Sequence, residues 1–222
     1  MKLVHSSLEG HIIKEEIKFV EWIIESPELF SGYVQELILQ CEGLEKDYVL
    51  SEGEKILDIS KVTEIVLNPF KININEKKII NKLYAELHQL AYAEDMYVET
   101  QELMQSIHNY LLKLEQKSEH MLEISNIVDM SLLFKAASIQ HEVMEEDYFE
   151  TIVRYIKIIV RLGIKLVAFI NIRSYLCDEQ LISFMKDMSY QDIKILFIEN
   201  VEKGCISGLY RYIIDTDRCE IF

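Results

Sequence analysis

The stretch KLVAFINIRS, Lys165 to Ser174, decides the fold. Residues 166–170 are all apolar, and Ile172 follows after Asn171. A strand is predicted over residues 166–172, because such an apolar run is typical of a strand buried on both faces of a parallel sheet. A helix is predicted over residues 178–188 and a second buried strand over residues 195–198. This βαβ order predicts an α/β domain. The helix residues expected to face the core are Leu181, Ile182, Met185 and Met188.

Earlier segments extend the same domain toward the N-terminus. Strands are predicted over residues 2–6, 17–24 and 64–67, because these short runs are rich in β-branched and aromatic residues. Ser26 followed by Pro27 predicts a helix start, since serine caps the first N–H groups and proline lacks the N–H that would be unpaired there. Glu52-Gly53 predicts the turn of a β-hairpin.

The middle of the chain has helical periodicity. Apolar residues recur at helical spacing after Asn75, a predicted helix cap, and again over residues 103–114. A third long helix is predicted over residues 146–162. We therefore expect an α/β head built from residues 1–69 and 144–222, interrupted by a mostly α-helical insertion, residues 70–143.

Composition indicates a globular cytoplasmic protein. Half of the 222 residues are apolar, enough to bury a sizeable core. The four cysteines form no CxxC pair, and no apolar run approaches the roughly 20 residues that span a bilayer, so no membrane association is expected. The formal net charge of −15 makes the average surface repel nucleic acid. DNA binding would need a local basic patch.

The sequence lacks a phosphate-binding loop. The turn after the first buried strand is Glu25-Ser26-Pro27, which has neither the glycines nor the lysine that cradle a phosphate in P-loop folds. One alternative is an enzyme that binds a nucleotide or phosphorylated ligand at the sheet edge from Asn171 to Tyr175, because ligands of open α/β sheets lie beyond the carboxyl ends of strands. The same segment also fits a solvated turn.

The six histidines form no metal or hydrolase signature. A Ser-His-Asp triad is assembled in space, however, so the sequence cannot exclude one.

A candidate nucleic-acid surface lies on the third long helix. Arg154, Lys157 and Arg161 are spaced i, i+3 and i+7, with Lys165 just beyond the helix end. Such a basic face can contact phosphate oxygens without reading bases. The alternative is a solvated helix face whose cations pair with the acidic residues Glu145, Glu146, Asp147 and Glu150.

A candidate metal site lies in the acidic segment around SEHMLEISNIVD. Calcium takes six to eight oxygen ligands, and Glu119, Glu123 and Asp129, with Glu115 nearby, supply carboxylates in an irregular segment. The spacing is not that of an EF-hand, and solvated surface charge is the alternative.

Taken together, these segments resemble the CRISPR-associated Csn-two family of type II-A systems. The resemblance is spread over nearly the whole chain. It is carried by VHSSLEGHI, IKFVEWIIESPELFSGYVQELI, VTEIVLNPFKIN, LLFKAASIQHE, KLVAFINIRSYLCDEQL, DIKILFIEN and YRYIIDTD.

The resemblance implies a head related to P-loop-type folds without ATPase activity. It also implies a non-enzymatic homotetrameric ring that holds double-stranded DNA ends through a basic hole, supported by calcium. Such proteins act in spacer acquisition with the Cas integrase complex and the RNA-guided effector nuclease. On this account Lys135 joins the DNA-contacting cations named above.

The sequence departs from the family pattern in the acidic segment. Ile124, Ser125, Asn126 and Ile127 fall near positions where carboxylates are expected. A protein scaffold whose apolar helices close a dimer, without binding DNA, is a third reading.

Overall fold

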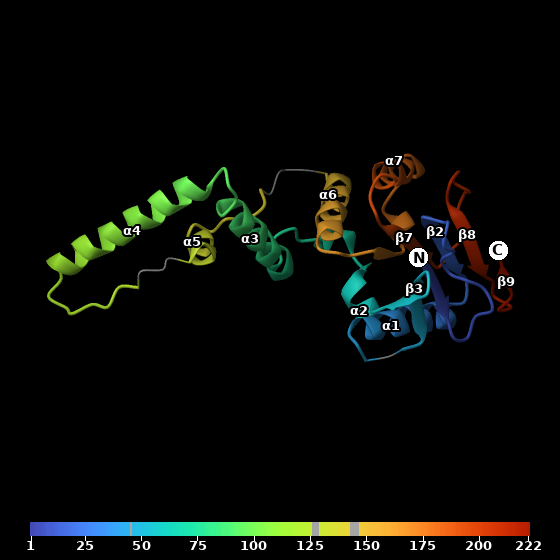
Figure 1. Cartoon of the computed structure of the whole chain (residues 1–222). Coiled ribbons are helices and arrows are strands. Elements are labelled where there is room, and N and C mark those ends of the chain that lie inside the picture. The colour runs from blue at the N-terminus through green and yellow to red at the C-terminus, as the bar shows by residue number, and fades with distance from the viewer. Residues whose placement is uncertain (45, 126–128, 143–146) are drawn as a thin grey trace. The chain divides into compact units, whose positions relative to one another are not determined.

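The computed structural model describes residues 1–44, 46–125, 129–142 and 147–222. The chain divides into two compact units, which are coloured along the chain in Figure 1. The head comprises residues 1–73 and 145–222, and the helical unit comprises residues 74–144. Each unit is described by itself.

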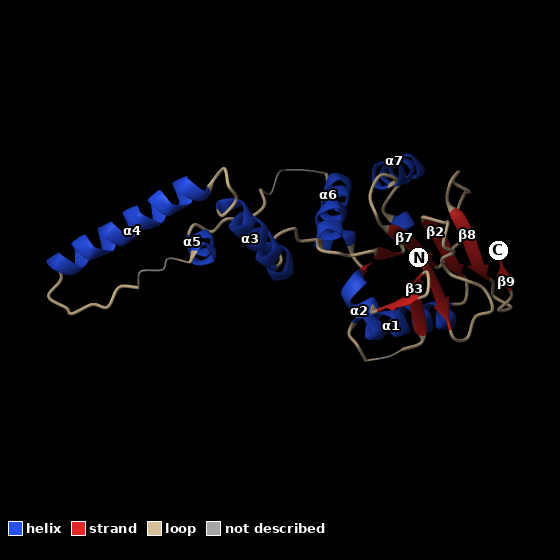
Figure 2. Ribbon diagram, viewed as in Figure 1, coloured by secondary structure: helices blue, strands red, loops and turns tan. Residues whose placement is uncertain are grey.

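A six-stranded sheet forms the centre of the head (Figure 2). The strand order is β5-β6-β7-β2-β8-β9, and all neighbours pair in parallel except β8 and β9. This confirms an α/β fold with a mixed, mostly parallel sheet. The strand bounds are β2 Phe19–Ile24, β5 Thr63–Val66, β6 Leu166–Ile170, β7 Lys194–Glu199, β8 Tyr210–Ile214 and β9 Glu220–Ile221.

Helices cover both faces of this sheet, with α1 (Pro27–Cys41) and α7 (Asp178–Met188) on opposite sides in Figure 1. Alternate residues of β2, namely Val20, Trp22 and Ile24, pack into the core that includes Val34 and Leu37 of α1. On the other face, the rings of Phe169 and Phe197 contact Phe184 of α7. Helix α6 (Tyr148–Arg161) lies against α7. Double-sided burial explains why the central strands are almost entirely apolar.

A small antiparallel sheet completes the head, with strand order β1-β3-β4. It comprises β1 (Lys2–His5), β3 (Tyr48–Glu52) and β4 (Lys55–Leu57), followed by the short helix α2 (Ile59–Val62). The predicted hairpin is confirmed, and Gly53 sits in its turn with φ of 58°, a conformation that glycine adopts readily. The predicted cap is also confirmed, because Ser26 Oγ accepts the N–H of Leu29.

Two predictions within the head are corrected. The strand expected over residues 166–172 ends at Ile170, because Asn171 has the left-handed φ of 54° and a 3-10 turn, η2 (Ile172–Ser174), follows. Ile182 was expected in the core, but it is 53% exposed and Phe184 is buried in its place. A further 3-10 turn, η1, spans Pro69–Lys71.

The helical unit contains α3 (Lys77–Ala91), α4 (Tyr97–Lys117) and α5 (Met130–Ala136). Tyr84 and Ala91 of α3 pack with Met130 and Phe134 of α5 in a small core. The predicted Asn75 cap is wrong. Glu76 occupies the cap position of α3, and the Asn75 side chain instead exchanges two hydrogen bonds with the backbone of His141, at 2.8 and 3.0 Å.

Across the described ranges, no helix combines the length and the apolar character needed to cross a bilayer.

Candidate functional site

In the turn after β2, the backbone and side-chain polar groups make hydrogen bonds within the fold. The N–H of Glu25 donates to the carbonyl of Ile214 at 3.0 Å, Ser26 caps α1, and Pro27 has no N–H. A phosphate cradle needs several free, converging N–H groups. This turn supplies no such set, and a relationship to P-loop folds stays a prediction.

At the carboxyl edge of the sheet, the Arg173 side chain turns inward and is only 1% exposed. Its guanidinium bonds the buried carboxylate of Glu21, and its Nη2 donates to Asp178 Oδ1 at 2.9 Å. The second oxygen of Glu21 accepts from Nε of Arg211 at 2.6 Å. One buried carboxylate therefore lies between two guanidinium groups, and Arg173 is not presented to a ligand.

Neighbouring polar residues hold the loops at the same edge. Glu199 Oε1 accepts the backbone N–H of Arg173 at 3.0 Å, and burial raises the pKa of Glu199 to about 7. Asn171 Oδ1 accepts the N–H of Asn200 at 3.1 Å. These side chains stabilise the loops after β6 and β7, which weighs against the enzyme alternative at residues 171–175.

Sequence reasoning missed this buried network, although one residue pointed to it. Glu21 interrupts the otherwise apolar strand FVEWII, and a carboxylate within a strand buried on both faces requires a buried cationic or hydrogen-bonding partner. The identity of the partners was not predictable, since Arg173 and Arg211 lie 152 and 190 residues further along the chain.

The basic residues of α6 lie away from its core-facing stripe. Lys157 and Arg161 are exposed and Arg154 is half-buried, whereas the opposite side of the helix buries a set of apolar and aromatic residues. The buried residues of α6 are Ile152, Val153, Tyr155, Ile156 and Ile159. The structure thus brings the three cations together on one outer face. Glu150 is exposed one turn earlier, and Glu145 and Glu146 lie outside the described residues.

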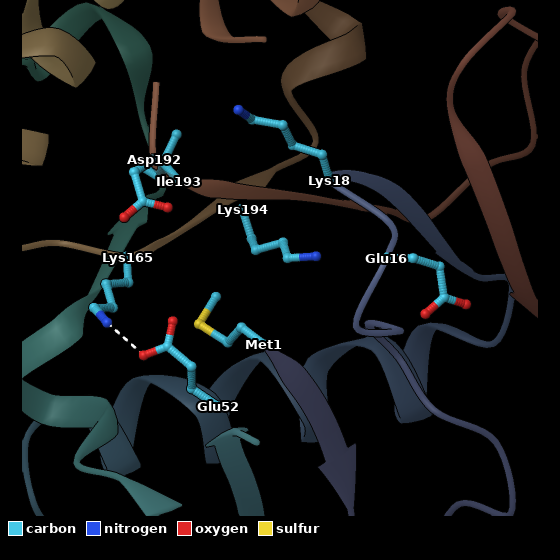
Figure 3. Close-up of a pocket in the computed structure, with 8 residues that line it drawn as sticks. All are labelled: Met1, Glu16, Lys18, Glu52, Lys165, Asp192, Ile193 and Lys194. Atoms are coloured by element: carbon cyan, nitrogen blue, oxygen red, sulfur yellow. Dashed lines mark hydrogen bonds and ion pairs between the residues drawn. The ribbon is translucent and has the colours of Figure 1, made fainter. Parts of the chain in front are cut away.

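Lys165 has a different environment, at the amino edge of the sheet (Figure 3). Its ammonium lies 2.6 Å from Glu52 Oε2, and this hydrogen bond raises the pKa of Lys165. Both residues line a pocket of about 260 Å³ together with Lys18 and Lys194. Burial lowers the pKa of each of these two lysines.

The other lysines of this pocket also serve the fold. Lys18 donates to the backbone carbonyls of Ser189 and Gln191, and Lys194 donates to those of Lys14, Glu15 and Ile17. An ammonium has three donors, so Lys194 has none left for a ligand. This pocket is therefore built by structural lysines.

Lys135, the remaining DNA candidate, is exposed on α5. It borders a shallow hollow of the helical unit together with Tyr84 and Ser138.

The predicted calcium ligands do not converge in the part of the chain that the structure describes. Asp129 caps α5, with Oδ1 accepting the N–H of Ser131 at 2.8 Å, while Glu119 and Glu123 are exposed in the preceding segment. Among the described residues, no three His, Cys, Asp or Glu side chains are grouped closely enough to hold a metal. Asn126 and Ile127 lie outside those residues, and calcium binding stays a prediction.

Comparison with known protein families gives a match. No curated protein matches the chain. Residues 40–218 match the protein family described as CRISPR-associated protein (Cas_Csn2), and this range includes the whole helical unit and part of the head. Because this match extends over most of the 222 residues, the chain belongs to the CRISPR-associated protein (Cas_Csn2) family.

Proposed function

We propose that this protein is a non-enzymatic accessory factor of CRISPR adaptation that binds double-stranded DNA ends without reading their sequence. It acts as a homotetrameric ring during spacer acquisition, together with the Cas integrase complex and the RNA-guided effector nuclease. Family membership supports the CRISPR setting. The observation that carries the DNA proposal is the outer face of α6, where Arg154, Lys157 and Arg161 lie together on an otherwise acidic protein.

The spacing of these cations suits a phosphate backbone. Arg154 and Arg161 are seven residues apart, so they span about 10 Å along the helix axis. One such face neutralises only a few phosphates and gives weak binding by itself. Four copies around one duplex multiply the number of contacts, which is why a weak patch per subunit is sufficient in a ring. Contacts with phosphates alone give affinity without sequence preference.

The enzyme alternative at the carboxyl edge has less support. A nucleotide site there needs a cation that faces solvent, whereas Arg173 is buried against Glu21 and Asp178. The proposed activity requires only positioning and electrostatic attraction, with no bond made or broken.

A paired charge-reversal experiment tests this proposal. The variant Arg154→Glu with Arg161→Glu is compared with the matched control Lys55→Glu with Lys186→Glu, which changes two exposed lysines elsewhere on the head by the same net charge. We expect the α6 variant to lose at least about tenfold in duplex affinity in a low-salt mobility-shift assay, because phosphate contacts dominate nonspecific binding.

The oligomeric state of both variants is checked by light scattering. Unchanged binding by the α6 variant, or an equal loss in the control, would remove this face from the account.

A further inference from the structure

A shallow hollow lies in the helical unit, where α3 and α5 pack side by side (Figure 1). Its volume is about 390 Å³, which is within the range of small-molecule sites. The hollow combines apolar side chains with one ammonium, one hydroxyl and two amides. Its lining residues are Ile80, Asn81 and Tyr84 from α3, and Lys135, Ser138, Ile139 and Gln140 from the end of α5 and the residues that follow it.

The segment after α5 is fixed by two backbone hydrogen bonds. The N–H of Ile139 donates to the carbonyl of Phe134 at 3.1 Å, and the N–H of Ser138 donates to that of Lys135 at 3.0 Å. This pair of bonds is the Schellman motif, in which the residue after the helix cap is left-handed. Ser138 has that conformation, with φ of 53°. Its side chain therefore has a defined position at the border of the hollow.

A serine is an unfavourable choice for this backbone position. The same pair of hydrogen bonds ends α1 and α6, where the left-handed residues are Gly43 and Gly163, with φ of 82° and 90°. Glycine adopts this conformation without the steric cost that a Cβ brings. Ser138 departs from the chemistry that the chain uses at those two helix ends. A strained residue at the border of a polar hollow points to a functional role for its side chain.

The other polar side chains of the hollow are available to a ligand. Asn81, Lys135 and Gln140 are exposed, and within the described ranges none of their side chains makes a hydrogen bond or an ion pair. An ammonium binds phosphate as a point charge, and a side-chain amide both donates and accepts, as the edge of a nucleobase does. Ile80 and Ile139 add half-buried apolar surface for the face of a base. This set of groups fits a nucleotide.

We propose that the hollow holds one unpaired nucleotide at the end of a bound DNA duplex. Lys135 and the hydroxyl of Ser138 contact its phosphate, and the amides of Asn81 and Gln140 contact the edge of its base. A rotated amide exchanges its donor and acceptor, so more than one base is accommodated. This inference rests on the proposed function, because it requires that duplex ends are bound. It adds a preference for ends that carry an unpaired base.

Fluorescence anisotropy with the full-length protein tests the site. The probes are a blunt duplex and the same duplex with a short unpaired extension of either polarity. We expect at least one extended duplex to bind about three- to tenfold more tightly, because a few added hydrogen bonds contribute modestly in water. Asn81→Ala with Gln140→Ala should remove this difference and leave the affinity for the blunt duplex unchanged. The matched control Gln89→Ala with Gln101→Ala, which removes two exposed amides elsewhere on the helical unit, should keep the difference.

Ser138→Gly separates a ligand contact from a structural role. It relieves the left-handed strain, so the unfolding midpoint should not fall, whereas the preference for extended duplexes should weaken. A folded Ser138→Gly protein with the full preference would refute the contact with Ser138. Equal affinity of the wild-type protein for blunt and extended duplexes would overturn the whole inference and leave DNA binding at α6 standing. If the protein binds neither kind of duplex, the proposed function fails as well.

Discussion

At the scale of single residues, the most consequential feature of the head is one buried carboxylate shared by two arginines. Glu21 is fully buried in β2, and its oxygens bond Arg173 and Arg211. Removing both charges from such a site can be neutral, but removing one partner leaves an uncompensated buried charge. The sheet edge therefore depends on Arg173 for stability, whatever ligand the protein binds.

The substitution Arg173→Met tests that dependence. It replaces the guanidinium with an apolar side chain of similar length, which leaves Glu21 with Arg211 as a partner and deprives Asp178 of Arg173. We therefore expect a loss of up to about 3–5 kcal/mol in the free energy of unfolding. The measurement is urea unfolding at neutral pH. Arg218→Met is the control, because Arg218 is 67% exposed and lies 3.9 Å from Glu28, and its loss should cost less than about 1 kcal/mol. Similar costs for both variants would contradict this account.

Glu199 predicts a pH dependence of stability. Burial raises its pKa from 4.5 to about 7, so the folded protein keeps a proton that the unfolded chain releases. The resulting stabilisation is fully present below pH 4.5 and is lost as the pH rises through 7. Glu199→Gln cannot titrate. Relative to wild type, its free energy of unfolding should rise by roughly 2 kcal/mol between pH 5 and pH 8. A constant difference between the two proteins over that range would refute the assignment.

At the scale of elements, the sequence predicted most accurately those features that depend only on neighbouring residues, such as helix caps and turns. Ser26 and Pro27 marked the start of α1, Gly53 marked the hairpin, and α7 has the predicted bounds Asp178–Met188. Tertiary contacts explain the failures. Asn75 can cap a helix, but its side chain makes hydrogen bonds with the backbone of His141, 66 residues away. Helical spacing predicted that Ile182 faces the core. In the structure Phe184 does so instead, and its ring packs against Phe169 and Phe197.

The candidate sites also divide into those that follow from residue spacing in one element and those that tertiary contacts create. The outer face of α6 follows from residue spacing along one helix, so it was predictable. Lys165 is adjacent in sequence but belongs to the amino edge of the sheet, because the chain turns at Gly163, with φ of 90°, before β6 begins. The contact between His5 of β1 and Glu36 of α1, 3.0 Å apart, could not be predicted, since it forms only when β1 packs against α1.

The C-terminal strand supplies a prediction about element packing. A Cβ on Gly10 would lie 2.0 Å from a ring carbon of Phe222, whose ring stacks on Tyr212 at 5.1 Å. Gly10→Ala should therefore displace the Phe222 ring and cost about 1 kcal/mol in unfolding free energy. In a Phe222→Ala background the same substitution should cost markedly less, as measured by a double-mutant cycle in urea. An equal cost in both backgrounds would mean that Phe222 does not occupy this position.

At the scale of the whole molecule, charge and assembly decide whether the proposed function is feasible. Each chain carries a formal net charge of −15, so most of its surface repels a duplex. In the proposed ring, DNA binding would be confined to faces such as that of α6, and several weak faces would act together as one stronger site. Threading of a duplex end through a ring adds a topological requirement that electrostatics alone does not impose.

The measurement that tests this central claim most directly is size exclusion coupled to light scattering, run with linear and with closed-circular duplex DNA of equal length. Parallel runs contain calcium or a chelator. The account predicts a tetramer that retains linear DNA and not closed circles, because only a free end can enter the ring. Loss of retention in chelator would support the predicted calcium dependence. A monomer or dimer that treats both DNA forms alike would contradict the account.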